Sequence, residues 1–243
     1  MKRAGFTLIE MLVVTTILIL LGSLTLPAIG RAMDRSQAVR CMSNLRTMGQ
    51  AVSIYLNEHD GQFPPALVSE DGVQKGWDFF IDGDGEVSPG WIWESYGVDS
   101  LLQCPSYEGS ENWLGEAYTG YNYNSSYLGG MRISRRGREI SDIPSARMTH
   151  IAHPERTAMF GDGAYAGGAN KFMRSPMPGP LDGSFQGREG GTQGYRHQGY
   201  THVVFVDGRV MRFRPVGVPS GFSGRVAEGT GFLSMDNMRY GGE

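Results

Sequence analysis

Residues 1–60 carry two hydrophobic patterns, one after the other. The first runs from Phe6 to Ile29 and contains no ionisable residue except Glu10. At about 1.5 Å rise per residue, a helix of these 24 residues is longer than the roughly 30 Å hydrocarbon core of a bilayer. The first pattern therefore predicts a membrane-spanning helix.

The second pattern, over residues 31–60, predicts an amphipathic continuation of the same helix. Apolar side chains recur there at spacings of three and four, and they are Ala38, Cys41, Met42, Leu45, Met48, Val52, Tyr55 and Leu56. Pro27 is expected to bend the helix, because it lacks an amide hydrogen. The helix should end near His59 or Asp60, where Gly61 offers a left-handed cap.

The remainder, residues 61–243, has the alternation and turn signals of a β-rich head. The stretch THVVFVDGRVMRF (201–213) contains two β-branched and aromatic runs around Asp207-Gly208, a strong hairpin signal. We expect its apolar side chains to cover the helix stripe, namely Val203, Phe205, Val210 and Phe213.

Three other segments are candidate strands. A hairpin or an extended pair is expected to flank residues 82–90. Residues 118–130 alternate Tyr and polar residues as an edge strand does, and residues 156–163 form a further strand. Glycine occurs 36 times, roughly double the usual ~7%, which predicts long Gly-rich loops. The expected fold class is α+β, with a long helix packed on an antiparallel sheet.

Residues 1–5 precede the apolar run and include Lys2 and Arg3. No Ala-x-Ala-like cleavage site follows the run, so any cleavage must lie before the helix. By the positive-inside tendency, the two basic residues place the N-terminus in the cytoplasm and send the head across the membrane.

Glu10 raises a question, because a carboxylate in a membrane helix costs about 2.5 to 3.5 kcal/mol and needs a reason or a partner. A position at the membrane interface is one explanation. The other is a resemblance: Gly5-Phe6-Thr7-Leu8-Ile9-Glu10 resembles the cleavage and methylation motif of type IV prepilins and type II secretion pseudopilins. The resemblance implies that a prepilin peptidase cuts between Gly5 and Phe6 and methylates the new amine. It also implies that Glu10 pairs with the Phe6 ammonium of a neighbouring subunit.

A second resemblance covers more of the chain. The segment from Cys41 to Pro65, the CPSYEG stretch from Cys104, and His197 followed nine residues later by Asp207-Gly208 resemble a prepilin-like family named for its His-X9-Asp-Gly signature. This resemblance implies a pilin-like organisation and supplies no catalytic residue. We expect His197, Asp207 and Gly208 to be structural, with His197 in a loop that hydrogen-bonds near the turn.

Charge and motif content argue against two function classes. With 22 basic and 25 acidic residues the net charge is -3, so no broad basic field for nucleic acid exists. The arginines of MRISRRGRE (131–139) are expected in a hairpin turn. The chain carries no Gly-x-Ser-x-Gly elbow, His-Glu-x-x-His motif or phosphate loop, and we expect no enzyme.

Two groups of residues are candidates for ligand or covalent chemistry. Asp82, Asp84 and Glu86 alternate on a Gly-rich loop, and major pseudopilins hold calcium in a loop of the head. Calcium is therefore one reading of this loop and a solvated acidic turn is the other. Cys41 and Cys104 are expected outside the cytoplasm, where they form either a disulfide or two buried thiols.

These features predict a structural subunit of a pilin-like filament, first of all a type II secretion pseudopilin. Its expected partners are a prepilin peptidase, other pilin or pseudopilin subunits and an inner-membrane assembly platform. The head is expected in the periplasm, and calcium is the one candidate cofactor. A type IV pilus subunit is the nearest alternative. A membrane-tethered binding module is another, and it would recognise a surface polymer through the Trp-rich head (Trp91, Trp93 and Trp113).

Overall fold

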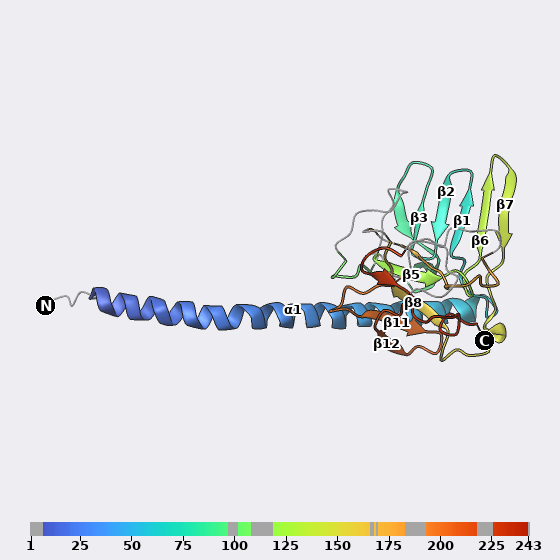
Figure 1. Cartoon of the computed structure of the whole chain (residues 1–243). Helices are drawn as coiled ribbons and strands as arrows, with labels where there is room; N and C mark the ends of the chain where they lie inside the picture. Colours follow the sequence, from blue (N-terminus) through green and yellow to red (C-terminus); the bar gives the residue numbers. More distant parts are fainter. Residues whose placement is uncertain are drawn as a thin grey trace.

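A single long helix reaches out of a β-rich head (Figure 1). The computed structural model describes residues 7–96, 102–107, 119–165, 168, 170–182, 193–217 and 226–242. Its helical elements are α1 (Leu8–Glu58), α2 (Trp91–Tyr96) and the 3-10 turn η1 (Met148–His150). The architecture is α+β, as the sequence predicts.

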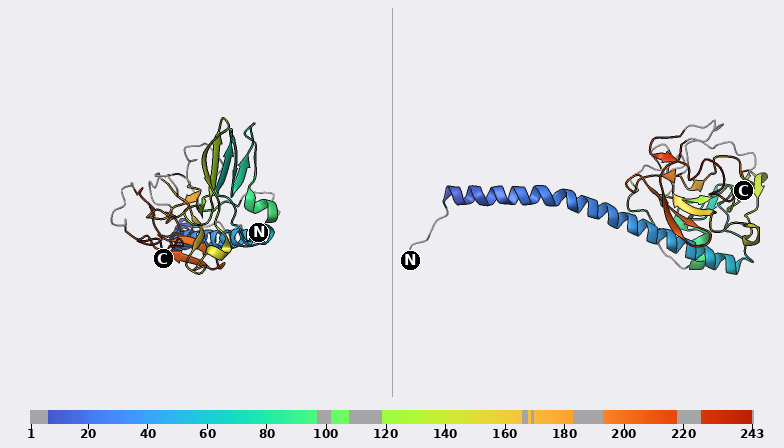
Figure 2. Two further views of the ribbon diagram at one scale, coloured as in Figure 1. Left: turned by 90° about the vertical axis from the view of Figure 1, so that its right-hand side faces the viewer. Right: turned by 60° about the horizontal axis from the view of Figure 1, so that its bottom comes forward.

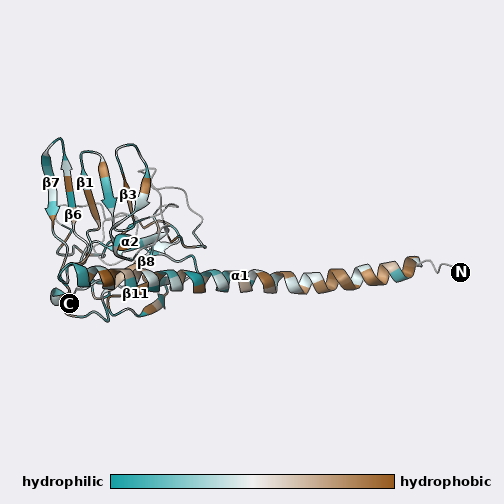
Figure 3. Cartoon of the chain, turned by 180° about the vertical axis from the view of Figure 1, so that it is seen from behind, coloured by the Kyte–Doolittle hydropathy of each residue, from teal (hydrophilic) through white to brown (hydrophobic). Residues whose placement is uncertain are grey.

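Helix α1 contains both hydrophobic patterns in one uninterrupted element of 51 residues, about 75 Å long. Pro27 lies inside it, and Figure 2 shows the helix curving between its free half and the head. The helix ends as predicted: the Gly61 amide, with φ +73°, donates to the Leu56 carbonyl at 2.8 Å. Figure 3 shows that the half of α1 far from the head is mostly hydrophobic, whereas the half on the head is mixed.

Within the described residues, the strands form three sheets. The six-stranded sheet contains, in spatial order, β4 (Val87–Pro89), β3 (Phe79–Ile81), β2 (Val73–Gly76), β1 (Leu67–Glu70), β6 (Met131–Arg135) and β7 (Arg138–Ile143). The five-stranded sheet contains β12 (Val210–Phe213), β11 (Thr201–Phe205), β8 (Ala158–Asp162), β5 (Tyr121–Asn124) and β9 (Phe172–Met173). The small third sheet pairs β10 (Gln193–Gly194) with β13 (Thr230–Gly231).

Most strand pairs are antiparallel, and β1–β6 and β5–β9 are parallel. The hairpins expected around residues 82–90 and Asp207-Gly208 are confirmed as β3–β4 and β11–β12. The strand expected within 156–163 is β8, and the arginine-rich stretch forms the β6–β7 hairpin. The sequence predicts one sheet packed on the helix. The described strands instead form separate sheets, and the six-stranded one stands away from the helix (Figure 1).

The prediction of an edge strand within residues 118–130 is wrong. Strand β5 lies between β8 and β9, and all four of its side chains are buried. Its polar side chains are tolerated there because they are hydrogen-bonded. Asn124 Nδ2 donates to the carbonyls of Ala158 and Tyr240, both at 2.8 Å, and Asn122 Oδ1 accepts from Gln193 at 3.3 Å.

The five-stranded sheet has an apolar cluster on each face, and this changes which hairpin side chains meet α1. Val204 and Val210 pack with the helix residues of the first cluster, whereas Val203, Phe205 and Phe213 belong to the second. The prediction for Val210 is confirmed, and for the other three it is wrong. A strand buried on both faces has no polar face to mark its orientation. The helix lies close to β11, since a Cβ on Gly49 would stand 3.2 Å from Val204 Cγ2.

A buried ion pair joins the two larger sheets. Lys171 Nζ lies 2.9 Å from Asp78 Oδ1, and the side chains are 2% and 1% exposed. The Trp77 indole donates to the Lys171 carbonyl at 3.0 Å, and Lys171 Nζ stands 3.4 Å from the centre of the Phe79 ring. The segment between β2 and β3 is thereby fixed to the segment that enters β9.

Residues near the C-terminus complete the second cluster. Tyr240 is fully buried, and its hydroxyl accepts a hydrogen bond from the Leu233 amide at 2.9 Å. The Arg239 carbonyl accepts from the Ala158 amide at the start of β8. The tail beyond residue 226 is therefore part of the core and not an appendage.

Candidate functional site

The first helical turn forms a closed capping box. Thr7 precedes α1, and its amide and hydroxyl both donate to Glu10 Oε2 at 2.8 Å, while the Glu10 amide donates to Thr7 Oγ1 at 3.3 Å. Such an arrangement satisfies backbone donors that a helix start leaves unpaired. Glu10, expected in assembly, is thus held by its own chain here. The processing residues Gly5 and Phe6 lie outside the described residues.

The apolar half of α1 is uncovered. Leu8, Leu24 and Leu26 expose 86%, 75% and 71% of their surface, and the most apolar 18-residue window of the helix has no buried residue. The helix is long and apolar enough to cross a membrane. Burial begins in the second half, where the predicted stripe is confirmed by Cys41, Leu45, Met48, Val52 and Tyr55.

The residues of the His-X9-Asp-Gly signature do not meet. His197 lies before β11, where its backbone pairs with Tyr200, whereas Asp207 and Gly208 follow the other end of that strand. Asp207 caps the turn by accepting the Arg209 amide at 3.0 Å, and Gly208 takes φ +84°. The turn role of these two residues is confirmed, but the expected bond of His197 near the turn is wrong.

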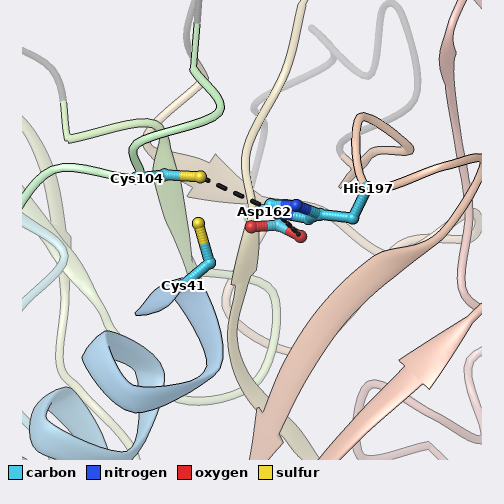
Figure 4. Close-up of side chains that lie close together, drawn as sticks. All are labelled: Cys41, Cys104, Asp162 and His197. Atoms are coloured by element: carbon cyan, nitrogen blue, oxygen red, sulfur yellow. Dashed lines mark hydrogen bonds and ion pairs between the residues drawn. The ribbon is translucent and has the colours of Figure 1, made fainter. Parts of the chain in front are cut away.

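His197 instead joins a buried cluster with Cys41, Cys104 and Asp162 (Figure 4). One ligand atom from each residue lies within 4.8 Å of every other, and all four residues are buried. His197 Nε2 stands 3.2 Å from Asp162 Oδ2 and 3.7 Å from Cys104 Sγ. Four distant segments of the sequence therefore converge at one point between α1 and the five-stranded sheet.

Local hydrogen bonds position each member of this cluster. Asn44, one turn after Cys41 on α1, donates to the Gln103 carbonyl at 3.1 Å and so holds the Cys104 segment against the helix. The Cys104 amide donates to the Thr119 carbonyl at 2.8 Å. Asp162 lies at the end of β8, where its Oδ2 accepts the His202 amide at 2.7 Å.

Comparison with known proteins adds one finding. The family model described as the prokaryotic N-terminal methylation motif matches residues 1–26. Residues 1–26 are prepilin-like. Searches of curated proteins and of solved structures found no match to this prepilin-like chain. The match spans Gly5, Phe6 and Glu10, which are the residues of the resemblance at the head of α1.

The buried cluster of the prepilin-like protein is strongly polarised. Interaction with Cys41 lowers the pKa of Cys104 to about 5, and His197 adds to this effect. Burial by itself lowers the pKa of His197, but its contacts with Asp162 and Cys104 outweigh burial and raise it to about 9. Burial likewise opposes ionisation of Asp162, yet hydrogen bonds from His197 and His202 hold its pKa below the usual range. The protonation states of Cys104, His197 and Asp162 therefore depend on one another.

Both cysteines of the prepilin-like protein are free and buried in the structure. Of the two readings that the sequence left open, this is the pair of buried thiols, and the disulfide is not formed. Cys104 Sγ lies 3.7 Å from His197 Nε2, and the two sulfurs share the cluster with the Asp162 carboxylate.

The acidic turn of the prepilin-like protein is organised by its own backbone. Asp82 Oδ1 accepts the amides of Asp84 and Glu86 at 3.0 and 2.8 Å, which is the geometry of a self-capped turn. Asp84 and Glu86 are exposed. Calcium binding at this turn stays a prediction.

The two described tryptophans of the binding-module reading do not form an open surface. Trp93 is 1% exposed, and Trp91 is covered by Lys75, whose Nζ lies 3.9 Å from the ring centre. Trp113 lies outside the described residues.

Among the described residues, sequence reasoning missed Asp162, which it treated only as part of a strand. No short-range spacing connects residue 162 with residues 41, 104 and 197.

Proposed function

We propose that this prepilin-like protein is a structural subunit of a filament that is built from N-terminally processed helices. The observation that carries the proposal is the uncovered apolar half of α1 directly behind the methylation motif. In a bilayer, lipid covers this half. Outside a bilayer only equivalent helices of neighbouring subunits offer a matching apolar surface, and each buried Leu or Ile side chain contributes about 1.5 to 3 kcal/mol there.

Glu10 supplies the proposed register between subunits. In the isolated chain its carboxylate is held by Thr7, which lowers the cost of placing it in the membrane helix. On assembly the carboxylate pairs with the methylated Phe6 ammonium of a neighbour. A charge buried among apolar helices is stable with a partner and strongly destabilising without one.

We propose that the subunit belongs to a type II secretion system. Before the subunit is extracted from the membrane, its head lies in the periplasm and its N-terminus in the cytoplasm. The proposed partners are a prepilin peptidase, other pseudopilins and an inner-membrane assembly platform. The role is structural and not catalytic. Deleting the gene tests this assignment: loss of protein secretion supports a pseudopilin, whereas intact secretion with loss of surface fibres supports the alternative of a pilus subunit.

Processing is tested by the intact mass of the membrane-extracted protein and its N-terminal peptide. The expected chain begins at N-methylated Phe6. A chain that still begins at Met1 in cells with an active prepilin peptidase overturns the proposal and leaves a tethered module.

Assembly is tested by Glu10→Gln, which keeps the side-chain size and removes the charge. We expect this variant to insert and be cleaved normally but to give no sheared or cross-linked filament. The matched control is Thr16→Val, because the Thr16 hydroxyl binds only the Leu12 carbonyl of its own helix at 2.7 Å among the described residues. Normal filaments from Glu10→Gln would refute the proposed role of the carboxylate.

A further inference from the structure

We propose that Cys41, Cys104, Asp162 and His197 bind one zinc ion that ties helix α1 to the head. These side chains come from α1, from the segment before β5, from the end of β8 and from the segment before β11. The ion would link these four chain segments to one another. This site is independent of the filament proposal.

The distances fit a tetrahedral ion. With Zn–S bonds near 2.3 Å and Zn–N or Zn–O bonds near 2.0 Å, donor atoms in a tetrahedron stand roughly 3.3 to 3.8 Å apart. The observed separations are 3.2 Å from His197 Nε2 to Asp162 Oδ2 and 3.7 Å from the same nitrogen to Cys104 Sγ. Since all four ligand atoms lie within 4.8 Å of one another, small side-chain movements complete the shell.

The donor set selects the metal. Two soft sulfurs and a borderline imidazole nitrogen, joined by one hard carboxylate oxygen, form a set that suits zinc and disfavours calcium or magnesium. Two thiolates and a carboxylate carry three negative charges, and zinc carries two positive ones. The remaining charge is balanced by Arg196, whose guanidinium lies 3.8 Å from Asp162 Oδ1.

The surroundings provide orientation and access. Asp162 Oδ2 accepts the His202 amide at 2.7 Å, which fixes the carboxylate as an outer hydrogen bond does in metal sites. Asp162 Oδ1 is buried without a hydrogen-bond partner among the described residues. An open cavity of about 610 Å³ reaches His197 and Arg196 from the surface and offers a path for the ion.

Two other chemistries explain the cluster less well. A Cys-His-Asp catalytic set requires the histidine to face the cysteine with one nitrogen and the carboxylate with the other. Here Nε2 faces both, while Nδ1 has no hydrogen-bond partner in the described part of the chain. A disulfide between Cys41 and Cys104 would use neither Asp162 nor His197, although both contribute ligand atoms to the same cluster.

The test uses the full chain in mild detergent, purified without chelators. Elemental mass spectrometry should find one zinc per chain, and Cys104→Ser, His197→Gln and Asp162→Asn should each reduce this to below roughly one tenth. His150→Gln is the matched control, because His150 is exposed on η1 and lies outside the cluster. It should retain the zinc.

A second measurement does not depend on the folding of a variant. The wild-type chain is reduced, stripped of metal by a chelator and titrated with Co²⁺, which should saturate at one equivalent and give sulfur-to-cobalt charge-transfer and tetrahedral absorption bands. A full chain that is lighter by two hydrogens, with the cysteines joined and no zinc, would overturn the proposal. So would a reduced chain that binds no Co²⁺ through sulfur.

Discussion

The buried pair Asp78–Lys171 allows a quantitative test of what holds the two larger sheets together. Burial raises the pKa of Asp78, whereas Lys171 and the local hydrogen bonds lower it. The effect of burial is the larger one, so the carboxylate is desolvated at a net cost. Asp78→Asn removes the negative charge that lies 2.9 Å from the Lys171 ammonium, which is 2% exposed. Removing one partner of such a pair costs about 3 to 5 kcal/mol.

The double variant Asp78→Asn with Lys171→Met should be far more stable than the sum of the single variants predicts. Because it removes both charges of the pair, we expect it to stay within about 2 kcal/mol of the wild type, with a coupling free energy of at least about 2 kcal/mol. The assay is urea unfolding of the full chain in detergent, followed by tryptophan fluorescence. Trp77 reports directly on this site, since its indole donates to the Lys171 carbonyl.

The control is Glu94→Gln, which breaks the pair between Lys75 and Glu94. That pair is closer, at 2.6 Å, but its side chains are 21% and 54% exposed. Removing it should cost at most about 1 kcal/mol. Equal losses from Glu94→Gln and Asp78→Asn, or additive effects of Asp78→Asn and Lys171→Met, would refute the claim that burial sets the energy of the pair.

Three further predictions concern the head. Burial, with a smaller effect of Glu94, raises the pKa of Tyr55 from 10.0 to about 12. Between those pH values the folded state keeps a proton that the unfolded chain loses, so the free energy of unfolding should fall as the pH rises from 10 to 12. The fall should be smaller in Tyr55→Phe. Asn124→Ala removes two buried hydrogen bonds, to the Ala158 and Tyr240 carbonyls, and should cost about 2 to 4 kcal/mol in urea unfolding. A Cβ on Gly130 overlaps the Ile143 carbonyl oxygen, so Gly130→Ala should lower the thermal midpoint sharply, whereas Gly22→Ala, which meets no atom within 4 Å, should not.

The elements with strong local signals could be predicted from the sequence. The stripe on α1 repeats at helical spacing, and Gly61 marks the helix end. The Asp207-Gly208 turn fixes a hairpin because its backbone requires a positive φ at Gly208. Each of these signals depends on residues that lie close together in the chain.

The wrong predictions concern strands that are buried on both faces and contacts between distant segments. In β5, Asn122 and Asn124 look like solvent-facing positions, but they are hydrogen-bonded inside the sheet. In β11, an unbroken apolar run carries no mark of which face meets the helix. Asp162 joins His197 only through the tertiary fold, so no local pattern connects them.

The burial of Tyr240 has a consequence for the order of events during synthesis. Strand β8 lies at the centre of its sheet, yet its first amide is bonded to the carbonyl of Arg239, and Tyr240 fills the cluster beneath it. The head can close this part of its core only after residue 240 has left the ribosome. In the proposed topology, this part of the head is therefore still open while the N-terminal helix engages the membrane, in a state that an export channel can accept.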